Sequence, residues 1–100
     1  MLTGNYTLKG QNPNGTAYKG TLEVQETNSV FLLTWQIGSS VHRGTGLLTD
    51  DILSVVWSTG SESGLATYRV AGNTLSGSWI GFGGLMKGKE TATRVRSELN

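Results

Sequence analysis

The chain has 100 residues, no cysteine, a net charge of +1 and only 15% charged residues. The absence of cysteine excludes a disulfide framework and a thiolate metal site. The weak charge argues against nucleic acid and anionic membranes as partners, because both select a basic surface.

Eight short apolar segments follow one another along the chain and predict eight β-strands. They are separated by turn residues at a spacing of about 11 residues, as is typical of a barrel or sandwich. No segment keeps a helical period. The predicted strands are 2–10, 16–26, 30–38, 41–48, 52–59, 65–71, 74–80 and 86–95.

Side chains in these segments alternate between apolar and polar, which predicts one inner face shared by all the strands. We expect a single all-β domain over residues 1–100, frayed at about 96–100. The predicted fold is an antiparallel up-and-down eight-stranded β-barrel, because closure removes exposed strand edges. A two-layer β-sandwich is the alternative.

Four apolar residues break this alternation and are predicted to point outward. They are Val30, Leu32, Ile52 and Val56. An exposed apolar patch is typical of an interaction surface, so these residues predict a homo-oligomer or favour the sandwich.

Three tryptophans recur at a fixed interval, since 57 − 35 = 22 and 79 − 57 = 22. A step of 22 residues corresponds to two strands and two turns, so the tryptophans lie on every second strand. In an up-and-down sheet these strands run in the same direction. Trp35, Trp57 and Trp79 are therefore expected near one level of the barrel.

The predicted inner face combines large rings with small residues. An eight-stranded barrel is just wide enough to be filled by side chains or to hold one small ligand. Either the rings fill the space beside the glycines, or they line an open pocket at one end of the barrel. The tyrosines on this face are Tyr6, Tyr18 and Tyr68, and the glycines are Gly4, Gly20, Gly44, Gly46, Gly77 and Gly88.

An open pocket predicts non-covalent binding of a small, partly apolar or aromatic molecule, because small-molecule sites are lined mostly by apolar and aromatic residues with a few polar groups. The walls would be Trp35, Trp57 and Trp79. The polar anchors would be Tyr18, Tyr68 and Glu90. A filled barrel instead predicts a structural or protein-interaction module that uses the outward apolar residues.

Glu90 is the one carboxylate that the alternation places inside. A buried carboxylate must be paired, hydrogen-bonded or protonated. It could serve as a structural partner for a tyrosine hydroxyl, an indole N–H or Arg94, as a ligand anchor, or as the acid/base of an enzyme. No partner constellation for catalysis is visible, so we expect binding rather than catalysis.

No cofactor or metal is expected. His42 is the only histidine, so no multi-histidine site can form, and it is interpreted as a strand-end residue. Asp50 and Asp51 suit a hairpin turn. The glycine-rich segment 81–84 lacks the following helix that phosphate binding uses and is interpreted as a loop carrying an exposed Phe82.

The start of the chain shows neither a charged n-region nor an apolar h-region. A cytoplasmic location is the expectation, with a trimmed secreted form as the alternative.

Several short motifs resemble those of a family of small uncharacterised bacterial β-barrel proteins. These motifs are Gly4-x-Tyr6, Gly10-x-Asn12-x-x-Gly15, Tyr18-x-Gly20, Gly44-Thr45-Gly46, the strand with Tyr68, and Leu75-x-Gly77-x-Trp79. The architecture is also similar to the calycin class of avidin-like and lipocalin-like barrels. The resemblance implies a barrel and brings no activity with it.

Overall fold

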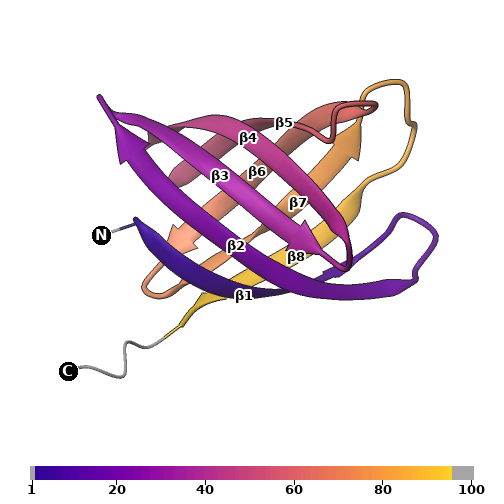
Figure 1. Cartoon of the computed structure of the whole chain (residues 1–100), viewed down its shortest axis with the longest axis horizontal. Coiled ribbons are helices and arrows are strands. Elements are labelled where there is room, and N and C mark those ends of the chain that lie inside the picture. The colour runs from indigo at the N-terminus through magenta and orange to yellow at the C-terminus, as the bar shows by residue number, and fades with distance from the viewer. Residues whose placement is uncertain (1, 96–100) are drawn as a thin grey trace.

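The computed structural model describes residues 2–95, which form a closed barrel of eight antiparallel strands in chain order (Figure 1). The strands are β1 (Gly4–Gln11), β2 (Ala17–Thr27), β3 (Val30–Ile37), β4 (Ser40–Thr49), β5 (Ile52–Ser58), β6 (Ser63–Ala71), β7 (Thr74–Gly81) and β8 (Gly88–Arg94). The ladder between β1 and β8 closes the sheet, so the predicted barrel is confirmed and the sandwich is wrong. The predicted frayed tail, 96–100, lies outside the described residues.

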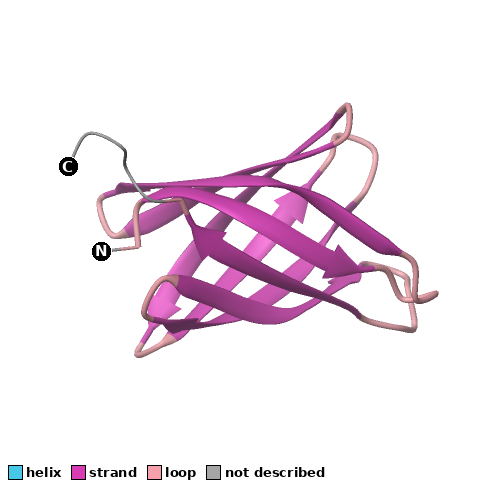
Figure 2. Ribbon diagram, turned by 90° about the horizontal axis from the view of Figure 1, so that it is seen from below, coloured by secondary structure: helices cyan, strands magenta, loops and turns pink. Residues whose placement is uncertain are grey.

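The strands are joined by tight turns at one end, whereas at the other end the connections β1–β2, β5–β6 and β7–β8 are longer and only β3–β4 is a tight turn (Figure 2). Asn28 and Ser29 join β2 to β3, and both have positive φ, at 53° and 67°. Two such residues in a row twist the hairpin in the same sense as its strands. Local turn chemistry therefore sets the register of this pair.

Alternation along the predicted strands 41–48 and 86–95 would place Leu48 and Met86 inward, and both positions are wrong. Met86 is 63% exposed, because the pairing of β7 with β8 ends at Trp79 and Gly88 and leaves Met86 in the preceding loop. Leu48 is 40% exposed, because it lies at the end of β4, beside the turn at Asp50. Met86 therefore precedes the barrel wall, whereas Leu48 lies within it, next to the last residue of β4.

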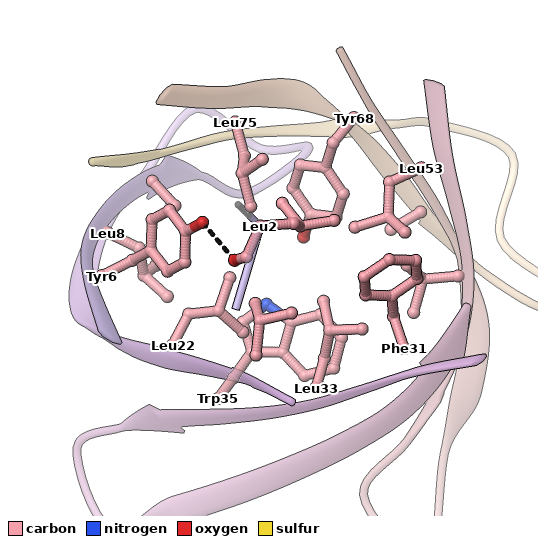
Figure 3. Packing of buried hydrophobic residues seen from close by; sticks show 14 residues of the cluster. Leu2, Tyr6, Leu8, Leu22, Phe31, Leu33, Trp35, Leu53, Tyr68 and Leu75 are labelled. Atoms are coloured by element: carbon pink, nitrogen blue, oxygen red, sulfur yellow. Dashed lines mark hydrogen bonds between the residues drawn. The ribbon is translucent and has the colours of Figure 1, made fainter. Parts of the chain in front are cut away.

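The end of the barrel that holds the start of β1 is filled (Figure 3). The Tyr6 hydroxyl donates a 2.5 Å hydrogen bond to the Leu2 carbonyl and accepts one of 3.0 Å from Arg94. Arg94 also donates to the Thr3 carbonyl at 2.6 Å. The core that fills this end includes Leu8, Leu22, Val24, Phe31, Leu33, Leu53, Val55 and Leu75.

The outward apolar residues lie on the outer wall of β3 and β5. Leu32 and Val56 are 41% and 54% exposed, and both pair with Thr45 of β4, so they lie in one cross-strand row. Val30 and Ile52 are partly exposed. Among residues 2–95, no helix is long and apolar enough to cross a membrane.

Candidate functional site

A cavity of about 430 Å³ opens at the end of the barrel opposite the Tyr6 and Arg94 contacts. The loops that connect β1 to β2, β3 to β4, β5 to β6 and β7 to β8 lie at this end (Figure 1). All six residues predicted from the sequence line this cavity. They are Tyr18, Trp35, Trp57, Tyr68, Trp79 and Glu90.

Strand register places Glu90 at the centre of a symmetrical row across five strands. On one side it pairs with Gly10, which pairs with Tyr18. On the other side it pairs with Gly77, which pairs with Tyr68. A glycine therefore separates the carboxylate from a tyrosine on each side, and each tyrosine reaches over a position that has no side chain.

Both tyrosines and one tryptophan donate to the Glu90 carboxylate, which is only 6% exposed. The hydroxyl of Tyr18 donates to Oε1 at 2.7 Å, and the hydroxyl of Tyr68 donates to Oε2 at 2.6 Å. Trp35 Nε1 donates to Oε2 at 3.0 Å, and Trp79 Nε1 donates to the Tyr18 hydroxyl at 2.9 Å. Both oxygens of the carboxylate therefore accept hydrogen bonds from the aromatic wall.

These bonds confirm two of the partners predicted for Glu90, a tyrosine hydroxyl and an indole N–H. Arg94 makes its hydrogen bonds to Tyr6 and Thr3 at the far end of β8. The hydroxyls of Tyr18 and Tyr68, which were predicted as polar anchors for a ligand, already donate to an acceptor within the protein. These bonds hold the aromatic wall together, which is the structural role expected for Glu90 as one of its alternatives.

Burial raises the pKa of both tyrosines. Desolvation is the largest cause for Tyr18 and for Tyr68, and the charge of Glu90 and its hydrogen bonds raise the pKa of each further. The bond from Trp79 to Tyr18 and the proximity of Trp35 to Tyr68 act in the opposite direction and are smaller. Both hydroxyls therefore remain neutral donors at physiological pH.

Four aromatic rings of the site each pack against a glycine on a neighbouring strand. A Cβ atom at any of these glycines would overlap the ring beside it. The rings can lie along the wall because the wall lacks side chains there, and the centre of this end stays open. The pairs are Tyr18 with Gly10, Trp35 with Gly44, Trp57 with Gly64 and Trp79 with Gly88.

Trp57 differs from the other two tryptophans. Its Nε1 is buried and has no hydrogen-bond partner among the described residues. Its ring stacks on His42, with centroids 6.1 Å apart and planes at 22°, and meets Trp79 edge-on with centroids 6.1 Å apart. Packing alone therefore holds Trp57 in place, whereas Trp35 and Trp79 are also held by hydrogen bonds.

Six polar residues that line the cavity were not predicted as part of the site: Asn12, Ser40, His42, Thr59, Ser61 and Glu62. His42 falls on the inward face of its strand in the alternation, so a signal was present, although it was interpreted as a strand-end residue. Asn12 and Glu62 lie on connecting loops, where no periodicity indicates direction. Within residues 2–95, no group of three histidine or carboxylate side chains could hold a metal ion.

The fold and the cavity define a small up-and-down barrel that is packed at one end and open at the other. Solved structures of the same shape include a redesigned beta barrel designated b11L5F_LGL, with a TM-score of 0.85, 16% identity, and coverage of 95% of this chain and 92% of that chain. A second redesigned barrel, mFAP1, was solved bound to DFHBI, with a TM-score of 0.77, 16% identity, and coverage of 93% and 94%.

A third similar structure is a de novo designed fluorescence-activating beta barrel, with a TM-score of 0.71, 15% identity and 93% coverage of both chains. No family model and no curated protein sequence matches the chain. At these identities the likeness shows the fold alone. The barrel is thus supported, whereas the similar structures are designed barrels and give the calycin resemblance no support as a family assignment.

Proposed function

We propose that this protein binds a small, partly apolar molecule without covalent chemistry, in the cavity at its tryptophan-lined end. The observation that carries the proposal is the cavity of about 430 Å³ beside three indole rings that pack against glycines of the wall. This volume lies within the range of small-molecule pockets. The designed barrel mFAP1, which has the same fold, was solved with DFHBI bound.

The roles follow from the geometry. Trp57 and Trp79 present apolar surface beside the mouth and meet each other edge-on. Trp35 lies deeper and is 4% exposed. Tyr18 and Tyr68 position Glu90, which is the polar anchor of the lining. A ligand with an apolar body and one polar end would match this distribution.

The test is a tryptophan fluorescence titration with para-tert-butylbenzyl alcohol, a compact neutral probe that does not absorb at the red edge of the indole band. We expect a saturable change in emission in the wild-type protein. Trp57→Ala should weaken binding at least tenfold while the fold is retained. Val56→Thr, at the neighbouring outward position, is the matched control and should bind like the wild type.

A loss of unfolding free energy of roughly 3–5 kcal/mol in Trp57→Ala, together with no response of the wild-type protein to the probe, would contradict the proposal. That result would mean that Trp57 is a packed core residue. Near-UV circular dichroism of both variants distinguishes loss of binding from loss of fold.

The second candidate function is a protein-interaction module that associates with itself. The row containing Leu32 and Val56 favours it, because these exposed apolar residues lie together on the outer wall with Leu65 next to Val56 on β6. Sedimentation velocity tests this function. A self-associating wild-type protein that becomes monomeric in Leu32→Lys, with the cavity unaffected, would support it, and a monomeric wild-type protein would contradict it.

A further inference from the structure

The charges of the cavity lining are unbalanced. Glu90 lies within it and Glu62 lies at its rim. Among the described residues, no lysine or arginine lines the cavity, and the one basic side chain, His42, stacks on Trp57 at the mouth. A low-dielectric pocket that holds a carboxylate with no opposing charge favours a cation over an anion.

The hydrogen bonds of Glu90 leave part of its acceptor capacity unused. Among residues 2–95, Oε2 accepts bonds from Tyr68 and Trp35, whereas Oε1 accepts one bond, from Tyr18. A carboxylate oxygen can accept two. Because Glu90 itself lines the cavity, the second position on Oε1 can be filled by an N–H group of a ligand.

The aromatic walls of the cavity also favour a cationic ligand. Aromatic faces attract ammonium groups through the ring quadrupole, and tryptophan is the strongest of the three aromatic residue types in this respect. Here three indoles and two phenols surround one carboxylate. Both phenols stay protonated because of burial and of Glu90, so the negative charge inside the cavity is that of Glu90.

We propose that the ligand of this cavity is a protonated amine with an apolar or aromatic body, whose N–H donates to Glu90 Oε1 and whose body lies against the indoles. This inference rests on the proposed function and specifies its ligand class. It excludes carboxylates and other organic anions of the same size as preferred ligands.

The test compares three probes that share one body and differ in charge: para-tert-butylbenzylamine, para-tert-butylbenzyl alcohol and para-tert-butylbenzoate. Each is titrated calorimetrically into the wild-type protein at neutral pH. We expect the amine to bind about tenfold or more tightly than the alcohol, and the benzoate to bind most weakly. The wild-type comparison alone decides, so it does not depend on whether a variant folds.

Glu90→Gln removes the charge and nearly preserves the shape. We expect the ratio of amine affinity to alcohol affinity to fall severalfold in that variant. Glu26→Gln, at an exposed position of β2 away from the cavity, is the matched control and should leave the ratio unchanged. A folded Glu90→Gln protein that keeps the full ratio would overturn the role given to Glu90.

The outcomes separate this inference from the proposed function. If the alcohol binds and the amine binds no better, the ligand class is wrong and the proposed function stands. If the benzoate binds best, the charge argument is wrong. If none of the three probes binds, both proposals fail together, because the cavity then admits no ligand of the size and polarity that its lining suits.

Discussion

Tyr68 and Glu90 meet across Gly77. The Tyr68 hydroxyl donates a 2.6 Å hydrogen bond to Glu90 Oε2, although β6 and β8 are not adjacent in the barrel. Gly77 of β7 pairs with both residues and presents no side chain between them. Gly10 stands in the same relation to Glu90 and Tyr18 on the other side. The open end of the barrel is therefore organised around one buried carboxylate.

The Glu90→Gln substitution should lower the unfolding free energy by about 1–3 kcal/mol, because the new amide nitrogen cannot accept a bond from one of the donors around it. Guanidinium unfolding followed by circular dichroism measures this change. Glu62→Gln should change stability by no more than about 0.5 kcal/mol, since Glu62 is exposed. Equal stabilities of the two variants would show that the network contributes nothing.

The Gly64→Ala substitution should destabilise the barrel by about 1–3 kcal/mol through overpacking. A Cβ atom there would overlap the Ile80 carbonyl oxygen and the Trp57 ring. Gly81 is its cross-strand partner and has no atom within 4 Å of a Cβ, so Gly81→Ala is the matched control and should be nearly neutral. Urea unfolding of both variants tests the difference, and similar costs at the two positions would refute this explanation.

The two tryptophans Trp35 and Trp57 should respond differently to replacement by phenylalanine. Trp35→Phe removes a donor to Glu90, whereas Trp57→Phe removes an N–H that has no acceptor among the described residues. We expect the Trp35 variant to be less stable than the Trp57 variant by about 1–3 kcal/mol. Thermal and chemical unfolding of the pair measure this. A larger cost for Trp57→Phe would contradict the assignment.

Alkaline pH should unfold the protein rather than ionise its tyrosines in place. Burial, followed by the charge of Glu90, raises the pKa of Tyr18 and Tyr68 above the ordinary value of 10.0. Above that pH the unfolded chain releases protons that the folded chain keeps, so the unfolding free energy is unaffected below about pH 10 and falls above it. Phenolate absorbance of these two residues should appear together with loss of near-UV circular dichroism. Their ionisation near the ordinary pKa in a folded protein would show that they are not buried donors.

Much of the fold follows from local patterns. Period-two alternation correctly predicts which side chains of β3, β5 and β7 face inward, because a strand alternates its faces wherever it lies. The 22-residue tryptophan interval predicts one level for Trp35, Trp57 and Trp79, and all three line the cavity at one end, with Trp35 more deeply buried than the other two.

The contacts within the site could not be predicted in this way. Alternation gives the face of Glu90 but not its height in the barrel, which depends on the register of β8 against β1 and β7. Register is a property of strand pairs and of the tilt at which the barrel closes. Two further features depend on how rings and glycines pack across neighbouring strands. One is that Trp57 Nε1 has no acceptor among the described residues, and the other is that this end of the barrel is open.

The most direct test of the central claim is a heteronuclear NMR titration of the wild-type protein with para-tert-butylbenzylamine. The three indole N–H signals report on the cavity, and the backbone amides of Leu8 and Val24 report on the packed end. We predict saturable shifts of the Trp57 and Trp79 indole signals at the same ligand concentration, with the Leu8 and Val24 amides unchanged. Indole signals that stay unchanged at saturating amine, or shifts confined to Leu32 and Val56 on the outer wall, would contradict a binding site inside the barrel.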